Sequence, residues 1–335
     1  MLNNEINQVI FSFLTLEEIY LIKNDSKLSV NMFLYCKYSN IKKIITIEEA
    51  SKYGYLEIVK YLINTGKDCS SDAIDYASLN GHLEIVQFLH MFKKKCTVDA
   101  IDDACLNGHF NIVKFLHIVG VKCSISAIDN ASFSGHLDII KYLHYNNIQC
   151  SIEAMDWSSQ NGHLEVVKYL HSIGKECTVN AMDWSSKNGH LEVVKYLHSI
   201  GKECTNFSID MAIIHGYLEI VQFLHSIGKD CSNNAMNFAS LNGYLEIVQY
   251  LHSIGKDCSD NAMDNASLNG YLEIVQYLHS IGKDCSFICM YNACKNGHLK
   301  IVKFLHYIGK ECTTVDIKIA TRNLHLKVVN YIISL

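Results

Sequence analysis

The chain of 335 residues contains no proline, and it has only two tryptophans. No run of about 18 or more apolar residues occurs, so the sequence predicts no membrane-spanning helix. The first residues lack the basic start and the small-residue cleavage site of a signal peptide. Lysine and arginine are scattered rather than gathered in a stripe, so the footprint of a nucleic-acid-binding protein is missing. We therefore expect a soluble monomer in a reducing cytoplasm that binds neither nucleic acid nor membrane.

What the chain has instead is a repeat with a fixed period of 27 residues. Residues 151–177 and 178–204 differ at four positions, and the same frame extends in both directions. Cysteine marks the frame at Cys69, Cys96, Cys123, Cys150, Cys177, Cys204, Cys231, Cys258, Cys285 and Cys312. Glycine marks it at Gly54, Gly81, Gly108, Gly135, Gly162, Gly189, Gly216, Gly243, Gly270 and Gly297. A fixed period of about 20–50 residues is typical of stacked repeats, in which each unit buries its apolar faces against its neighbours.

Each repeat predicts a helix, a tight turn and a second helix, and hence an all-α solenoid. The Ser or Thr after each cysteine is a helix N-cap residue, because its side-chain oxygen can accept a bond from a free backbone N–H. In the repeat at 178–204, a short helix is predicted over residues 181–186. Gly189 then supplies the positive φ of the turn, and a second helix covers residues 190–199 until Gly201 ends it. Two repeats replace this last glycine, by Lys93 and by Asn147.

The residues of each unit resemble an ankyrin repeat. The segment N-G-H-L-E-V-V-K-Y-L-H-S-I-G-K-E-C at 188–204 is similar to the second half of that repeat. Asp72–Ser78 takes the place of its Thr-Pro-Leu-His-Leu-Ala-Ala helix start, and the resemblance covers residues 43–335. The chain departs from the family because it has no proline and because the usual ankyrin period is about 33 residues. The missing residues are those of the β-hairpin finger.

The resemblance implies a non-catalytic scaffold that binds a protein partner. Because the fingers are absent, we expect the partner on the concave face formed by the first helices. The abundance of isoleucine, asparagine, lysine and tyrosine without proline also resembles ankyrin arrays of giant viruses of amoebae. For a viral protein the cytoplasm would be that of the host.

Residues 1–42 do not follow the repeat. A helical apolar stripe is formed by Ile6, Val9, Ile10, Phe13 and Leu14. The segment resembles the first half of an F-box, the module that docks on Skp1-type adaptors, although the family's proline is missing. That resemblance would make the protein a substrate adaptor of a Skp1/cullin-type ubiquitin ligase. The alternative is a helical cap on the first repeat. Ten repeats are predicted over residues 43–312, and residues 313–335 are predicted to be a truncated capping repeat.

Cysteine, histidine and aspartate recur as ladders, and we interpret all three as structural. Equivalent residues of stacked repeats lie about 8–10 Å apart, whereas a disulfide needs Cα atoms within about 7 Å. The cysteines are therefore expected to be reduced, small buried side chains in valine positions. The histidines, one set of which alternates with tyrosine, are expected to pack or to form hydrogen bonds. The aspartates either tie neighbouring repeats together or form an acidic stripe; they are Asp75, Asp102, Asp129, Asp156, Asp183, Asp210 and Asp264. The sequence predicts no metal, no cofactor and no catalytic residue.

Positions that vary between repeats are the candidates for partner binding. One row begins with Tyr76, Asp103, Asn130, Trp157, Trp184, Met211 and Phe238, and it continues with Asn265 and Asn292. A second row, three residues further on, includes Gln160 and Lys187. A position that accepts Asp, Trp and Asn cannot be tightly packed core, and exposed aromatic side chains are typical of interaction hot spots. The two tryptophans either anchor a partner or stack on each other to fill a gap between repeats.

Overall fold

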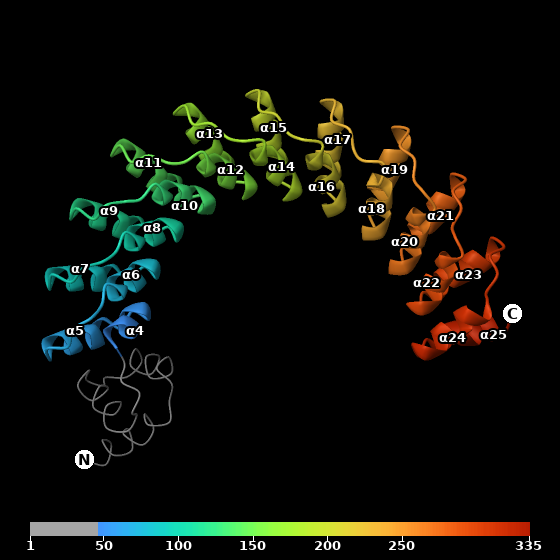
Figure 1. Ribbon diagram of the computed structural model, residues 1–335, viewed down its shortest axis with the longest axis horizontal. Helices are drawn as coiled ribbons and strands as arrows, with labels where there is room; N and C mark the ends of the chain where they lie inside the picture. The colour runs from blue at the N-terminus through green and yellow to red at the C-terminus, as the bar shows by residue number, and fades with distance from the viewer. Residues whose placement is uncertain (1–45) are drawn as a thin grey trace, which may run out of the picture. The chain divides into compact units, whose positions relative to one another are not determined.

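The computed structural model describes residues 46–335, and all regular structure in this part of the chain is α-helical (Figure 1). Its twenty-two helices, α4 to α25, alternate between the first and the second helix of each repeat. The predicted all-α solenoid without β-hairpin fingers is thus confirmed. The segment over residues 1–42, predicted to be F-box-like or a cap, lies outside the described residues. None of the described helices is long and apolar enough to cross a bilayer.

The described chain comprises two compact units, which follow one another in the sequence at Ala154 and Met155. In the first unit the first helices are α4 (Ile47–Lys52), α6 (Asp72–Leu79), α8 (Asp99–Leu106) and α10 (Ser126–Ser134). The second helices are α5 (Leu56–Asn64), α7 (Leu83–Met91), α9 (Phe110–Ile118) and α11 (Leu137–Tyr145). Each first helix lies against the first helix of the next repeat, and each second helix against the next second helix. The unit therefore has two helical layers.

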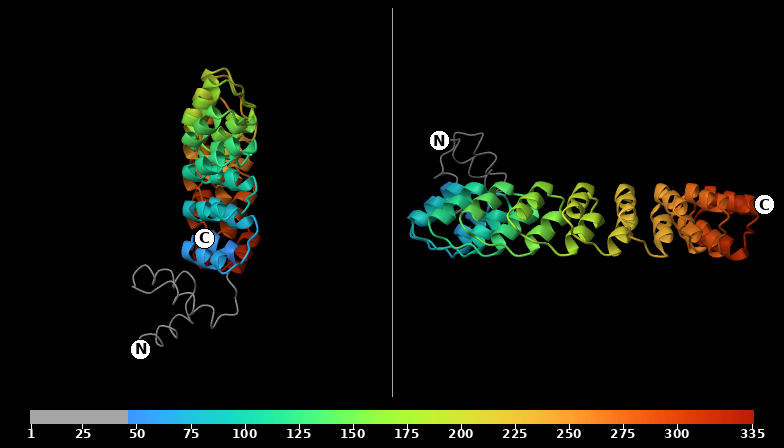
Figure 2. Two further views of the ribbon diagram at one scale, coloured as in Figure 1. Left: turned by 90° about the vertical axis from the view of Figure 1, so that its left-hand side faces the viewer. Right: turned by 90° about the horizontal axis from the view of Figure 1, so that it is seen from above.

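The second unit continues the same order after α12 (Glu153–Gln160), which spans the boundary. Its other first helices are α14 (Asn180–Lys187), α16 (Phe207–His215), α18 (Ala235–Asn242), α20 (Asn261–Asn269), α22 (Ile288–Lys295) and α24 (Thr314–Arg322). Its second helices are α13 (Leu164–Ser172), α15 (Leu191–Ser199), α17 (Leu218–Ser226), α19 (Leu245–Ser253), α21 (Leu272–Ser280), α23 (Leu299–Tyr307) and α25 (Leu326–Ile333). Figure 2 shows successive helix pairs of this unit, coloured yellow to red, side by side.

Small residues on the first helices and branched apolar residues on the second helices form the core. Ala181 and Met182 of α14 are buried, as are Val193, Val194 and Leu197 of α15. Burying one valine or leucine side chain contributes about 1.5–3 kcal/mol, and the pattern recurs in most of the described repeats. Within each unit the core therefore runs from repeat to repeat rather than around one centre.

Left-handed residues end the helices where glycine was predicted to do so. Gly189 has a φ of 85° and Gly201 a φ of 77°. Lys93 and Asn147, which replace glycine, adopt the same conformation, with φ of 56° and 62°. Leu324 takes the place of the turn glycine in the last repeat with a φ of 61°. A left-handed conformation costs a residue with a Cβ roughly 1–2 kcal/mol, and least for asparagine.

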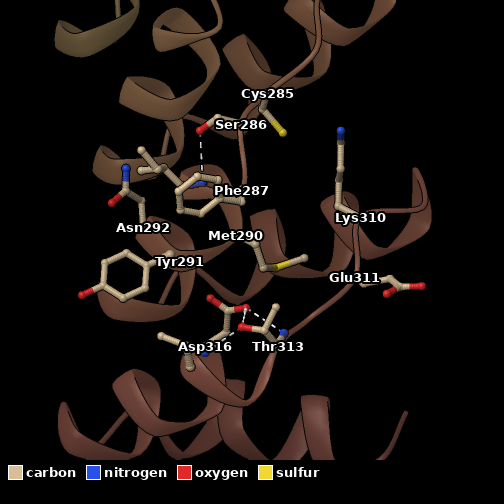
Figure 3. A pocket seen from close by; sticks show the side chains of 12 residues that line it. Cys285, Ser286, Phe287, Met290, Tyr291, Asn292, Lys310, Glu311, Thr313 and Asp316 are labelled. Atoms are coloured by element: carbon tan, nitrogen blue, oxygen red, sulfur yellow. Dashed lines mark hydrogen bonds between the residues drawn. The ribbon is translucent and has the colours of Figure 1, made fainter.

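In most repeats the Ser or Thr after the cysteine that marks the frame (the phase cysteine) caps the first helix, but it stands one residue before the N-cap and is not, as predicted, the N-cap itself. We count positions in a repeat from this residue, which is position 1. Helix α8 begins at Asp99, and the backbone N–H of Asp99 donates to Thr97 Oγ1 at 3.1 Å. The residue between them, Val98, already has helical backbone angles. In α24 the hydroxyl residue is itself the N-cap and forms a capping box, in which Thr313 pairs with Asp316 (Figure 3).

The phase cysteines are less buried than predicted. Cys204, Cys231 and Cys285 are buried, whereas the other seven are half-buried. All thirteen described cysteines are free thiols. Burial raises the pKa of the Cys123 and Cys177 thiols to about 11, so these two side chains are protonated at neutral pH.

Candidate functional site

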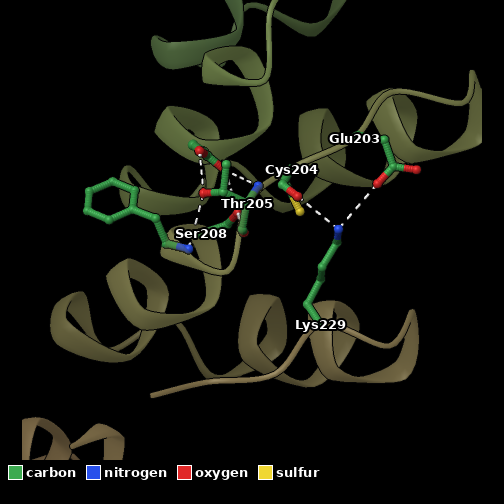
Figure 4. A network of polar contacts seen from close by, with 7 residues as sticks. Glu203, Cys204, Thr205, Ser208 and Lys229 are labelled. Atoms are coloured by element: carbon green, nitrogen blue, oxygen red, sulfur yellow. Dashed lines mark hydrogen bonds and ion pairs between the residues drawn. The ribbon is translucent and has the colours of Figure 1, made fainter.

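A carboxylate clamp joins consecutive repeats. Asp183, at position 6 of its repeat, accepts hydrogen bonds from the backbone N–H of Thr205 at 3.0 Å and from its hydroxyl at 2.8 Å. Thr205 is position 1 of the next repeat. The Ser208 hydroxyl donates to Asp183 Oδ1 at 2.6 Å, and the Phe207 N–H donates to Thr205 Oγ1 at 3.1 Å (Figure 4). One aspartate thus fixes the start of the following helix.

The same clamp recurs along both units. In the first unit the pairs are Glu48–Ser70, Asp75–Thr97, Asp102–Ser124 and Asp129–Ser151. In the second they are Asp156–Thr178, Asp183–Thr205, Asp210–Ser232 and Asp264–Ser286. Burial raises the pKa of the Asp75, Asp102 and Asp264 carboxyls, and the hydrogen bonds only partly oppose it. These buried aspartates tie repeats together; they do not form an exposed acidic stripe.

A lysine forms a further contact between consecutive repeats beside the clamp. Lys229 Nζ lies 3.2 Å from Glu203 Oε2 and donates to the Cys204 carbonyl oxygen at 2.8 Å (Figure 4). Glu203 is largely exposed, so water screens the ion pair, which contributes about 0–1 kcal/mol.

The histidines and tyrosines at position 13 cover the turn glycine of the preceding repeat. A Cβ placed on Gly189 would lie 2.5 Å from Tyr217 Cε1, and one on Gly81 would lie 2.7 Å from His109 Cε1. His109 Nε2 also donates to the Leu79 carbonyl oxygen at 3.2 Å. The predicted packing and hydrogen-bonding roles of this ladder are both seen.

The histidines at position 21 face an aromatic residue of the next repeat. His171 Nδ1 lies 2.9 Å from Tyr196 Oη, within hydrogen-bonding distance. Where the next repeat has phenylalanine, as in His198 and Phe223, the rings meet edge to face at 5.7 Å. The histidines at position 21 therefore contribute contacts between consecutive repeats.

The candidate partner-binding residues of the first unit are partly accessible. Tyr76 is exposed, whereas Asp103 and Asn130 are half-buried. Asn130 Nδ2 donates to the Asp102 carbonyl oxygen at 3.2 Å, so this side chain also stabilises the stack.

The candidates of the second unit show the same intermediate accessibility. Lys187 is exposed, while Trp157, Gln160, Trp184, Met211 and Phe238 are half-buried. The carbonyl oxygen of Gln160 accepts a hydrogen bond from Asn188 Nδ2 at 2.8 Å. Both rows therefore lie at the edge of the contacts between first helices, where a side chain can touch its neighbour and still meet solvent. Their role in binding stays a prediction.

A cavity of about 860 Å³ opens in the tenth repeat, where the position 6 aspartate is replaced by Tyr291. Without that carboxylate, Thr313 forms its own capping box with Asp316. Figure 3 shows Phe287, Met290 and Tyr291 on one side of the cavity and Thr313 and Asp316 on the other. Phe287 is 87% exposed, although it is a large apolar side chain.

A second cavity also lies at a repeat in which the position 6 aspartate is replaced. It measures about 380 Å³ and lies at the corresponding place in the eighth repeat, where Asn237 stands at position 6. Asn237 Nδ2 still donates to the Ser259 hydroxyl at 3.0 Å, but its Oδ1 has no hydrogen-bond partner among the described residues. Partial loss of the clamp thus accompanies the smaller cavity and complete loss the larger one.

Two thiols meet at the wall of the larger cavity. Cys285 lines the cavity, and Cys289 of α22 is fully buried beside it. A hydrogen bond with Cys289 lowers the pKa of the Cys285 thiol, and the same bond together with burial raises the pKa of Cys289. This site was not among those predicted from the sequence. Its signal is that Cys289 and Tyr291 both break the repeat frame within one short helix.

Comparison with solved structures finds weak similarity to a pentatricopeptide repeat protein. The pentatricopeptide repeat protein PPR10 from maize is 10% identical, with a TM-score of 0.40, over 92% of this chain and 53% of that one. PPR10 in complex with an 18-nt psaJ RNA element is 10% identical, with a TM-score of 0.35, over 99% of this chain and 67% of that one. The chain thus spans about half the length of the first of these. That the chain binds no nucleic acid stays a prediction.

Sequence comparison identifies the family. No curated protein sequence matches the chain. The family model described as ankyrin repeats (3 copies) matches residues 47–129, 101–183, 128–208 and 209–288. These matches together span residues 47–288, well over half of the chain, and they coincide with the paired helices and glycine turns described above. The chain belongs to the ankyrin repeat family.

Proposed function

We propose that this protein is a non-catalytic scaffold that binds a protein partner through its first-helix layer, with the tenth repeat as the anchoring point. The observation that carries the proposal is the cavity of about 860 Å³ at that repeat. It is open beside Phe287 and Ile288, which are 87% and 42% exposed. Burying an apolar side chain of a partner against them would contribute about 1.5–3 kcal/mol.

The cavity lies next to the predicted row of variable residues, because one member of that row lines it. Asn292, the tenth-repeat member of that row, lines the cavity and donates to the Asp264 carbonyl oxygen at 3.2 Å. A segment that places an apolar side chain beside Phe287 can therefore continue along the row towards Phe238. Half-buried side chains suit this role, because the stack already holds them in place and binding orders them little further.

The test is a selection of displayed peptides against the full chain, followed by fluorescence anisotropy of the enriched peptides. We expect peptides with a large apolar anchor. Their binding should weaken at least about tenfold in Tyr291→Asp, which removes an aromatic side chain from the cavity wall and offers Thr313 the carboxylate that most other repeats provide. Asn237→Asp introduces the same position 6 aspartate in the eighth repeat and should leave binding unchanged. Enriched peptides that bind Tyr291→Asp as tightly as the wild type would contradict the proposal.

The runner-up function, a Skp1-docking substrate adaptor, depends on residues 1–42, which lie outside the described part of the chain. Nothing in the described residues favours it. A Skp1-type adaptor captured by the full chain, but not by a chain that starts at Ile41, would establish it.

A further inference from the structure

Three side chains with metal-binding donor atoms converge at the junction of the ninth and tenth repeats. They are Asp264 of α20, Cys285 at the end of the ninth repeat and Cys289 in the first turn of α22. One donor atom from each lies within 4.8 Å of the other two. All three side chains are buried. We propose that they bind a single divalent metal ion of the zinc type, a site that does not depend on the proposed partner binding.

The donor set selects the kind of ion. Calcium and magnesium take oxygen ligands, whereas thiolate sulfur favours zinc and related softer ions. Zinc lies about 2.3 Å from sulfur and about 2.0–2.2 Å from carboxylate oxygen in a tetrahedral site, so its ligand atoms are roughly 3.5 Å apart. The donors of Asp264, Cys285 and Cys289 already approach this spacing. Small side-chain rotations would complete it.

The fourth ligand can come from the cavity. Zinc is almost always four-coordinate, and three protein ligands leave one position for water or for a bound molecule. Cys285 belongs both to the donor cluster and to the cavity wall. The ion would therefore be held by protein on one side and be reachable from the cavity on the other.

The loaded site would carry a small negative charge that faces a lysine. Binding releases the two thiol protons to solvent, and a divalent ion with two thiolates and one carboxylate carries a net charge of about −1. Lys310 is close enough to interact electrostatically with both thiols, and it lines the same cavity. Its ammonium group, which also pairs with Asp284 at 2.6 Å, stabilises the remaining negative charge.

Neighbouring serines already hold two of the ligands in place. Ser286 donates to Asp264 through its backbone N–H at 3.2 Å and its hydroxyl at 2.6 Å. The Ser267 hydroxyl lies 2.8 Å from Cys289 Sγ. A thiolate can only accept, so Ser267 would donate to Cys289 once the metal is bound. Such partners fix the orientation of metal ligands.

Comparison with the other repeats shows that Cys289 is the donor peculiar to the tenth repeat. Cys289 stands at position 4, where seven other repeats have alanine and one has Ser208. Most repeats pair a phase cysteine with a position 6 aspartate, but none of the others places a second cysteine at position 4. Replacing Cys289 by alanine therefore returns the tenth repeat to the common pattern, and such a variant keeps a residue that this position accommodates.

The experiment is a titration of the full chain with Co²⁺, a spectroscopic substitute for zinc, under a phosphine reductant. We expect one Co²⁺ per chain, sulfur-to-cobalt charge-transfer bands and the intense visible bands of a tetrahedral site, displaced by one equivalent of Zn²⁺. Cys289→Ala should weaken binding at least about tenfold, and so should Asp264→Asn, which introduces the residue that Asn237 provides in the eighth repeat. Cys294→Ser changes a buried cysteine of the same helix to the serine that most repeats carry, and it should bind as the wild type does.

Two results would overturn the proposal. One is a wild-type chain that shows no charge-transfer band with Co²⁺. The other is a band that persists with unchanged affinity in Cys289→Ala, since the metal would then be held by other groups. Circular dichroism of each variant ensures that a lost band reflects a lost ligand and not an unfolded chain.

Discussion

The ring of Tyr217 occupies the space that a side chain on Gly189 would need. A Cβ on Gly189 would lie 2.5 Å from Cε1 and 2.7 Å from Cζ of that ring. Gly189 also has a φ of 85°, so both its backbone conformation and its neighbour require glycine. Gly201 has a similar φ of 77°, but nothing lies within 4 Å of the place its Cβ would take.

The two glycines should therefore differ in their tolerance of alanine. Gly201→Ala introduces only backbone strain, which costs roughly 1–2 kcal/mol. Gly189→Ala adds a steric clash with Tyr217 that costs about 1–3 kcal/mol more. We expect the urea midpoint, followed by circular dichroism, to fall clearly further for Gly189→Ala. Equal losses would mean that Tyr217 moves aside freely.

The clamp aspartates should make stability depend on pH in an unusual direction. Burial raises the pKa of Asp102 above its ordinary value of 3.8. The folded chain then binds the proton more tightly than the unfolded chain, so stability is lost as the pH rises through the raised pKa. Asp102→Asn cannot titrate. We expect the unfolding free energy of the wild type, relative to this variant, to fall as the pH rises above the ordinary aspartate pKa of 3.8 towards neutrality.

The measurement is a set of urea unfolding curves for the two proteins across that range. A wild type that gains stability relative to Asp102→Asn as the pH rises would show the opposite sign. The bonds from Ser124 would then favour the charged carboxylate more than burial opposes it.

Lys93 offers a stabilising substitution. It adopts a φ of 56° at a position where most repeats have glycine. Lys93→Gly should raise the unfolding free energy by about 1 kcal/mol, because the left-handed strain disappears, although the added freedom of the unfolded chain opposes part of the gain. Asn147→Gly is the matched control and should gain less, since asparagine tolerates this conformation. Thermal unfolding of both variants measures which one gains more stability. A larger gain for Asn147→Gly than for Lys93→Gly would contradict the prediction.

The two tryptophans are expected to serve the surface rather than the core. Trp157 and Trp184 are half-buried, while the alanines of their helices, Ala154 and Ala181, are fully buried. The double variant Trp157→Ala, Trp184→Ala should keep the helical circular dichroism signal of the wild type. It should also bind first-helix partners more weakly. Loss of helicity in the double variant would place the tryptophans in the core.

Much of the fold could be predicted because its determinants are local. The glycine at 189, the hydroxyl residue after each cysteine and the apolar stripe at Val194 and Leu197 act within a few residues. The N-cap was predicted one residue too early: Val98 is the N-cap of α8, and the Thr97 hydroxyl bonds to the N–H of Asp99 across it. The burial of the phase cysteines was overestimated, since they lie in the loop that joins one repeat to the next, and most of them remain half-buried there.

The candidate site was less predictable, because its features depend on contacts between repeats. Asn130 was identified as a variable surface residue, yet its amide also bonds to the backbone of the preceding repeat. The effect of Tyr291 cannot be read from its own repeat, because it appears at Thr313, which loses the carboxylate it would have bonded to.

The sequence by itself determined the period, the helix pair, the glycine turns and the family, since these follow from short-range chemistry repeated many times. Only the tertiary structure decided which aspartate holds which hydroxyl, where the clamp is missing and which three donors meet. Those relationships join residues of successive repeats, such as Asp183 with Thr205 and Asp264 with Cys289. Their distances are set by how one repeat stacks on the next, which no single repeat encodes.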